Sequence, residues 1–194
     1  MVTMEEEQII AEIAKHYESI ISLLGDNPGR PGLEKTPMRA AKALYYATQG
    51  YRQDAAATIK SAIFDYAGSR MVIVKDIEFY SFCEHHILPF FGKVSIGYIP
   101  DGEMVGLSKL ARAVNVYARR LQVQERLTAE ICDTVASSLK NKGVIVVCNA
   151  QHLCMKMRGV EKQESSTSSI EYTGEFASNP ALREEFFRML SDVK

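Results

Sequence analysis

Apolar residues in the N-terminal quarter of the chain recur every three or four positions. This spacing predicts an amphipathic helix over residues 5–24, because such positions share one face of a helix. The stretch 25–35 is rich in Gly, Pro, Asp and Asn and predicts a loop. Thr36-Pro37 offers a capping hydroxyl followed by a proline at the first helical position, so we expect a second helix from 36 to about 49. A short helix is expected over residues 55–63.

From residue 71 onward, runs of β-branched and aromatic residues alternate with stretches of helical spacing. In chain order we expect strands over 71–80 and 93–99, helices over 108–120 and 127–140, strands over 144–148 and 164–173, and a C-terminal helix that begins at Asn179-Pro180. This β-β-α-α-β-β order, followed by one helix, predicts a fold of the α+β class. We divide the chain into an N-terminal helical extension, residues 1–65, and a larger domain, residues 66–194.

The overall composition excludes several classes of protein. The 194 residues are 46% hydrophobic and 24% charged, which is typical of a folded globular chain. Lys and Arg number 23 against 24 Asp and Glu, so the chain lacks the basic field of a nucleic-acid-binding protein. The sequence has no run of about 18 apolar residues, and its acidic start MVTMEEEQII does not resemble a signal peptide. We therefore expect a cytoplasmic protein with no nucleic-acid or membrane partner.

The cysteines and histidines are the most informative residues of the sequence. Three of the four histidines lie within three residues of one of the four cysteines. Cys83 and His86 are three residues apart, and Cys154 follows much later in the chain. Two thiolates and one imidazole form a donor set that suits Zn²⁺, and three protein ligands leave the fourth tetrahedral position open for water, as in catalytic zinc sites.

The alternative interpretation is that these thiols are simply buried. Cys132 and Cys148 lie in apolar stretches, where a free cysteine packs like a small hydrophobic residue. Cys148 still stays a candidate fourth ligand, because it lies six residues before Cys154 and would share its face of a continuous strand. His85 and His152 adjoin the proposed ligands, so a folded site would bring both imidazoles near the metal, where they could transfer protons at neutral pH.

Five long segments of the chain resemble the type I GTP cyclohydrolase family. They are GDNPGRPGLEKTPMRAAKAL, SFCEHHILPFFGKVSIGYIP, VGLSKLARAVNVYARRLQVQERLT, AQHLCMKMRGV and NPALREEFFRML, and they are spread from residue 25 to residue 190. The resemblance implies the tunnelling fold, in which a β-β-α-α-β-β unit forms an antiparallel sheet with helices on one face. It implies zinc ligands at Cys83, His86 and Cys154, and a homodecamer of two stacked pentamers with active sites between subunits.

The implied reaction converts GTP and water to formate and 7,8-dihydroneopterin triphosphate, the first step of tetrahydrofolate and pterin biosynthesis. In this reaction a zinc-bound water attacks C8 of the guanine ring, and His85 and His152 supply the proton transfers. The resemblance places guanine recognition on Glu125 and counts the adjacent Gln124 among the substrate-binding residues. It places binding of the triphosphate on hydroxyl and basic residues, namely Ser108, Lys109, Arg112 and Arg158 and, from another subunit, Arg39 and Lys42.

Two other kinds of protein are consistent with parts of the pattern. One is another enzyme of the tunnelling fold, either a nitrile reductase with a nucleophilic cysteine, NADPH and no zinc, or a pyruvoyl-tetrahydropterin synthase with three histidine ligands. The Cys-His-Cys set argues against both. The other is a non-catalytic ring protein whose zinc only stabilises the fold, and the presence of His85, His152 and Glu125 argues against it.

Overall fold

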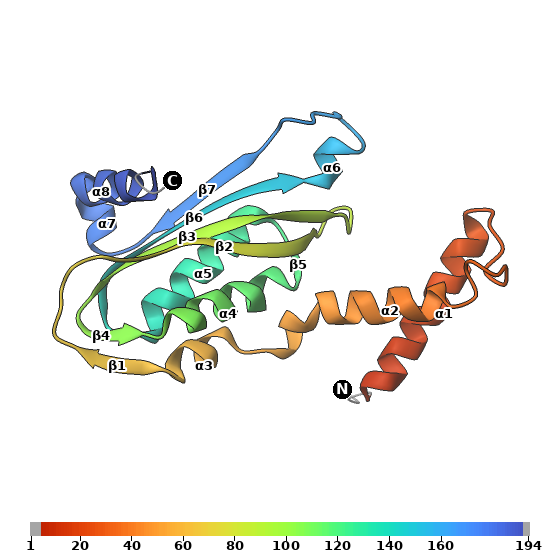
Figure 1. Ribbon diagram of the computed structural model, residues 1–194, viewed down its shortest axis with the longest axis horizontal. Coiled ribbons are helices and arrows are strands. Elements are labelled where there is room, and N and C mark those ends of the chain that lie inside the picture. The colour runs from red at the N-terminus through yellow and green to blue at the C-terminus, as the bar shows by residue number, and fades with distance from the viewer. Residues whose placement is uncertain (1–4, 192–194) are drawn as a thin grey trace. The chain divides into compact units, whose positions relative to one another are not determined.

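The computed structural model describes residues 5–191 (Figure 1). It contains two compact units that divide between Gln49 and Gly50, and the short 3₁₀ helix η1 (Gln49–Arg52) spans that division. The functional boundary expected at residue 65 stays a prediction. α3 (Ala55–Lys60), which was predicted over 55–63, belongs to the second compact unit.

The first unit is a pair of helices joined by a loop. α1 (Glu6–Leu23) and α2 (Thr36–Ala47) have bounds close to those predicted, and Pro37 lies in the first turn of α2 as expected. The two helices bury Ile10 and Ala41, together with a neighbouring alanine, in a small core. The helical periodicity of the N-terminal sequence is therefore explained by packing within this unit.

The second unit is built on one five-stranded sheet. Its strands, in spatial order, are β5 (Leu121–Gln122), β2 (Val72–Cys83), β3 (Pro89–Pro100), β6 (Asn141–His152) and β7 (Thr167–Tyr172). All neighbouring strands are antiparallel except β2 and β5, which are parallel. This register places the end of β2, the start of β3 and the end of β6 at the same edge of the sheet.

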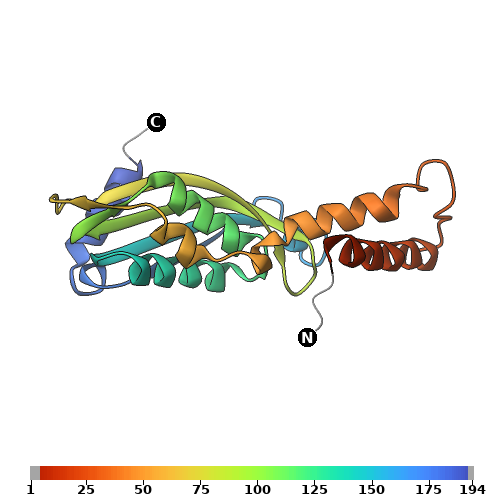
Figure 2. The same cartoon turned by 90° about the horizontal axis from the view of Figure 1, so that it is seen from below.

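Helices cover the two faces of this sheet unequally. α4 (Leu107–Ala118) and α5 (Gln124–Ser138) lie on one face and form the main core with the long strands (Figures 1 and 2). The short α7 (Glu175–Ser178) and α8 (Pro180–Ser191) enclose a smaller core at one end of the opposite face. Among residues 5–191, no helix combines the length and the hydropathy needed to cross a membrane.

The order β2-β3-α4-α5-β6-β7 is the predicted β-β-α-α-β-β order. The chain therefore has the tunnelling fold of the α+β class, preceded by an N-terminal helical extension, as the sequence predicted. α5 begins three residues earlier than expected, so the QERLT segment forms its first turn and not a connection between helices.

Several strands are longer than the sequence predicted. β6 was expected over 144–148 but continues to His152, because its polar end pairs with Phe90 to Lys93 of β3. The hydrogen bonds of a ladder join backbone groups, so a polar strand end leaves no apolar signal in the sequence. A two-stranded sheet of β1 (Ile63–Tyr66) and β4 (Gly102–Val105) was also not predicted.

Candidate metal and catalytic site

The predicted metal ligands lie at the edge of the sheet where β2 ends. Cys83 is the last residue of β2 and is 5% exposed, and the chain turns back after it to start β3. The turn is closed by hydrogen bonds from the Cys83 N–H to the Leu88 carbonyl, 2.9 Å, and from the Ile87 N–H to the Cys83 carbonyl, 2.8 Å. Ile87 adopts a φ of 52° in this turn. The tight return of the backbone brings the His86 imidazole over the Cys83 thiol, with Nδ1 3.8 Å from Sγ.

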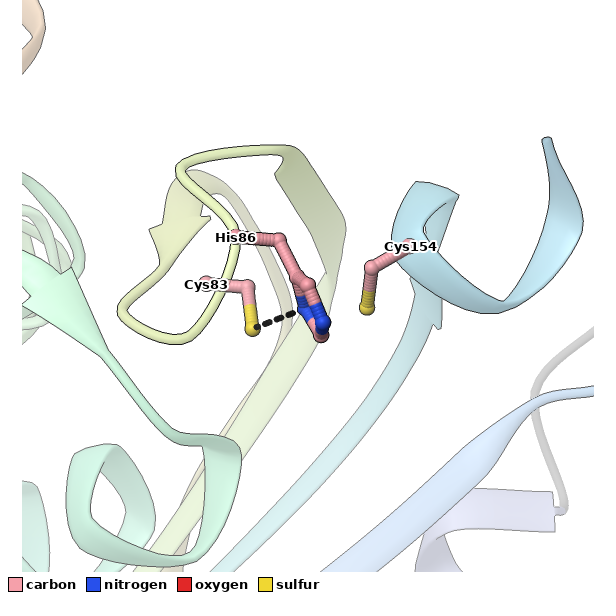
Figure 3. Close-up of side chains that lie close together, drawn as sticks. All are labelled: Cys83, His86 and Cys154. Carbon is pink, nitrogen blue, oxygen red and sulfur yellow. Dashed lines mark hydrogen bonds between the residues drawn. The ribbon is translucent and has the colours of Figure 1, made fainter. Parts of the chain in front are cut away.

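Cys154 reaches the same place from the end of β6. It belongs to the one-turn helix α6 (Leu153–Lys156), which follows β6 directly. The donor atoms of Cys83, His86 and Cys154 all lie within 4.8 Å of one another. Figure 3 shows the three side chains pointing toward a common point between the β2–β3 turn and α6.

The expectation that Cys154 lies in a strand was wrong, and this changes the position of Cys148. Because α6 interrupts the extended backbone, the two cysteines do not share a strand face. Cys148 is buried in the main core, and burial raises the pKa of its thiol to about 12. Among the described residues the group that can hold a metal contains three donors, and Cys148 is not one of them.

The three donors fit a zinc ion. With Zn–S bonds of about 2.3 Å and Zn–N bonds of about 2.0–2.1 Å, neighbouring donors of a tetrahedral site lie roughly 3.5–3.8 Å apart. The Cys83–His86 separation of 3.8 Å already matches this spacing. Burial raises the pKa of the Cys154 thiol, and the sulfur of Cys83 beside it raises that pKa further. Two thiols whose negative forms repel each other would be stabilised together by a dication between them.

His152 lies beside this group as the last residue of β6. Its ring stacks on Phe90, with ring centroids 4.6 Å apart and an interplanar angle of 2°. Its Nε2 is 2.9 Å from Oε1 of Gln124, the first residue of α5. Burial lowers the pKa of His152, and the nearby Glu125 carboxylate opposes that shift. His152 is therefore a fixed, half-buried imidazole, whereas the side chain of His85 is 62% exposed and lies 3.7 Å from the Cys83 thiol.

An ion pair that the sequence did not predict joins the metal-binding turn to α5. Arg126 donates to the Glu84 carboxylate, to the Leu121 carbonyl at 3.0 Å and to the Gln122 side chain at 3.0 Å. The Glu84 N–H in turn donates to the Gln122 carbonyl, 2.9 Å. Glu84 lies between the ligand Cys83 and the next histidine, so this network orients the turn. No local pattern in the sequence indicates this ion pair, because Glu84 and Arg126 are 42 residues apart.

Comparison with known proteins shows the family of this chain. The profile of GTP cyclohydrolase I matches residues 13–191. A GTP cyclohydrolase 1 from Porphyromonas gingivalis is 51% identical over 190 residues, which cover 98% of each chain, and the human GTP cyclohydrolase 1 is 49% identical over 186 residues, which cover 96% of this chain and 74% of the human one. The chain belongs to the GTP cyclohydrolase I family. The resemblance found in the sequence is thereby confirmed.

Another relative and one solved structure complete this comparison. A GTP cyclohydrolase 1 from Chlorobium phaeovibrioides is 53% identical over 187 residues, which cover 94% of this chain and 84% of that one. Among solved structures, an archaeosine synthase QueF-Like in the apo form matches 56% of this chain and 97% of its own, with a TM-score of 0.45 and 19% identity.

Within this GTP cyclohydrolase I family chain, the predicted substrate residues fall into separate groups. Glu125 is exposed in the first turn of α5, and its charge raises the pKa of His152. The charge of Arg158 lowers the pKa of Cys154, so both side chains lie near the candidate metal site. Gln124 is buried with its amide bonded to the protein. Arg39 and Lys42 are exposed on α2, one turn apart.

The remaining three predicted residues lie in the first half of α4. Ser108, Lys109 and Arg112 occupy its first two turns, whereas its last residue is followed by β5, which pairs with Cys83 at the metal end (Figure 1). A helix of this length spans about 17 Å. One copy of the second unit therefore does not bring its own α4 start to its own metal ligands.

Proposed function

We propose that this chain is a zinc-dependent GTP cyclohydrolase, which converts GTP and water to formate and 7,8-dihydroneopterin triphosphate. The observation that carries the proposal is the convergence of the Cys83, His86 and Cys154 donors beside the fixed imidazole of His152, in a chain of this family. Hydrolysis at a ring carbon requires an activated water and a proton donor, and this convergence supplies the residues for both.

Cys83, His86 and Cys154 would hold the zinc ion. When bound, zinc lowers the pKa of a coordinated water to about 7, which makes hydroxide available at neutral pH. C8 of guanine is a poor electrophile until N7 is protonated. The enzyme therefore also needs an acid close to N7. His152 is the better placed of the two candidate histidines, because stacking on Phe90 and the bond to Gln124 fix its ring. The exposed His85 would exchange protons with solvent in the later steps.

Incubation of the purified chain with GTP tests this proposal. Formate and a fluorescent pterin should appear together with GTP alone, without NADPH. A chelator should stop both, and added Zn²⁺ should restore them. Turnover of a nitrile with NADPH would show instead a reductase of the same fold, and bound zinc with no consumption of GTP would show a purely structural metal.

Glu125 is the proposed reader of the guanine base. The N1–H and the 2-amino group of guanine form a pair of donors, and one carboxylate can accept from both. Glu125→Ala is expected to weaken GTP binding by at least about 100-fold, because it removes two charge-assisted hydrogen bonds that contribute about 1.5–3 kcal/mol each. Inosine triphosphate lacks the 2-amino group, so the preference for GTP over inosine triphosphate should shrink in the variant. Equilibrium binding of both nucleotides measures this.

The matched control for this change is Glu184→Ala on the exposed surface of α8, which removes the same charge. It should leave both affinities unchanged, and zinc content should equal that of the parent in both variants. An unaltered ratio between the two nucleotides in Glu125→Ala would refute the assignment of guanine recognition to this residue.

We also propose a homodecamer of two stacked pentamers with each active site formed between subunits. Supporting this, Ser108 and Lys109 lie about 14–15 Å, and Arg112 about 9 Å, along α4 from its metal end, so we infer that a neighbouring copy supplies them. If so, His152→Ala and Arg112→Ala subunits should complement each other when coexpressed. With random mixing of the two variants, about one quarter of the sites would contain both native residues.

Activity of the coexpressed mixture at low GTP measures this complementation, with each variant alone as its control. Each pure variant is expected to be severely impaired, and the mixture should recover about a quarter of the parent activity if subunits mix at random. A mixture no more active than the average of its two components would show that each site is built within one chain.

A further inference from the structure

The side-chain amide of Gln124 is enclosed by hydrogen-bond acceptors. Gln124 is 1% exposed at the start of α5, where α5 packs against the ends of β6 and β7. Its Nε2 lies 3.0 Å from the Cys148 carbonyl, 3.0 Å from the Thr167 carbonyl and 3.1 Å from Ser169 Oγ. Two strands therefore present backbone oxygens to the same end of this amide.

These contacts decide which way the amide faces. A carbonyl oxygen has no hydrogen and only accepts, so the amide atom opposite two carbonyls must be the nitrogen. The reverse orientation would bury the amide oxygen against two carbonyl oxygens, neither of which can donate to it, and this is costly away from water. The chemistry of the neighbours thus fixes the orientation of the Gln124 amide.

The orientation of the amide in turn fixes the proton on His152. Gln124 Oε1 faces Nε2 of His152 at 2.9 Å, and an amide oxygen has no proton to donate. The imidazole must therefore carry its hydrogen on Nε2. Stacking on the fully buried Phe90 holds the ring plane, and across residues 5–191 the structure shows no other hydrogen bond to this ring.

We infer that Gln124 is a positioning residue that holds neutral His152 as the Nε2–H tautomer, so that Nδ1 is the atom through which this imidazole exchanges protons during GTP hydrolysis. This inference rests on the proposed function for its catalytic part. It gives Gln124 a role other than the substrate contact predicted from the resemblance. Both amide hydrogens point at protein acceptors, so the side chain acts on the reaction through His152.

The ring nitrogens of His152 report the tautomer directly. The zinc-loaded, full-length protein, labelled with ¹⁵N in its histidine rings, is compared with Gln124→Leu by ¹⁵N NMR at about pH 8, where an imidazole is neutral. The His152 signals are those that disappear in His152→Asn. We expect a protonated Nε2 and a bare Nδ1 in the parent, and a mixture of both tautomers in Gln124→Leu.

Kinetics of the same variant separate a positioning role from a binding role. Gln124→Leu should retain zinc and lower kcat about 10–100-fold, less than removal of the acid itself, with a change of no more than about threefold in KM. The matched control is Ser169→Ala, which removes one acceptor of the amide but leaves both carbonyls. Its His152 ring should keep the parent tautomer.

Three results would overturn the inference. They are a protonated Nδ1 in the parent protein, an unchanged tautomer in Gln124→Leu, and a Gln124→Leu variant whose KM rises while kcat is kept. The NMR measurement on the parent needs no turnover, and it uses His152→Asn only to assign the His152 signals. A chain that releases no formate but shows the Nε2–H ring would therefore refute the proposed function and leave the tautomer assignment standing.

Discussion

Cys154→Ala is expected to remove the bound metal and the hydrolysis of GTP together. The variant loses one of three donors, and the remaining Cys83 and His86 lie on one short turn that cannot surround an ion. Loss of a residue that merely orients a ligand costs roughly 10–100-fold in metal affinity, so loss of a ligand should cost more than about 100-fold. Zinc per chain, measured by elemental analysis after dialysis, should fall close to zero, and formate release should fall to the background rate.

Cys132→Ala is the matched control. Cys132 is a free cysteine like Cys154, but it lies on α5 in the main core. Loss of a small buried group there should lower the free energy of unfolding by about 1 kcal/mol while zinc content stays at one per chain. A Cys154→Ala protein that still binds one zinc per chain would exclude Cys154 as a ligand, whatever its activity.

The metal group was predictable because its signal is chemical and local. Cys83 and His86 are three residues apart, and in the structure that spacing corresponds to one turn between two strands. Cys154 was predictable from donor chemistry, since two thiolates and an imidazole suit one ion. What the sequence could not supply was the backbone at Cys154, because LCMK has neither a capping residue nor enough length to predict a helix.

The parts of the site that were missed depend on contacts between distant segments. Gln124 and His152 are far apart in sequence, and the register of β3 with β6 and the early start of α5 bring them together. Glu84 and Arg126 similarly meet only because β5 pairs with the end of β2. Polar residues in a sequence reveal that they can bond, but only the fold determines their partners, so single residues were identified and their networks were not.

The same difference between local sequence patterns and contacts made by the fold explains why the length of β6 was underestimated. Val144–Cys148 is apolar because it is buried on both faces, between α5 and α7–α8, and this stretch was recognised. The continuation of β6 to His152 is polar apart from Ala150 and reaches only the first residue of α5, although its backbone pairing is unchanged. The residues that carry the proposed chemistry therefore lie where the sheet leaves its core, which is also where sequence patterns are weakest.

His152→Ala is expected to leave the zinc site intact and to remove most of the turnover. His152 is not a donor of the metal group, and its ring contacts Phe90 and Gln124 at the edge of the core, so water can replace it. A positioned acid or base contributes about 10²–10⁴-fold to a rate, and kcat should fall by that factor. Added imidazole should restore part of the activity, because a small base can enter the space left beside Phe90.

The control is His16→Ala, which removes an exposed imidazole from α1 and should change neither zinc content nor kcat. Elemental analysis, formate release and thermal unfolding of both variants separate the outcomes. Lost zinc in His152→Ala would mean that the ring supports the metal site and not the proton transfer. Full turnover with zinc retained would mean that another group protonates the purine, and the mostly exposed His85 would then be the residue to replace next.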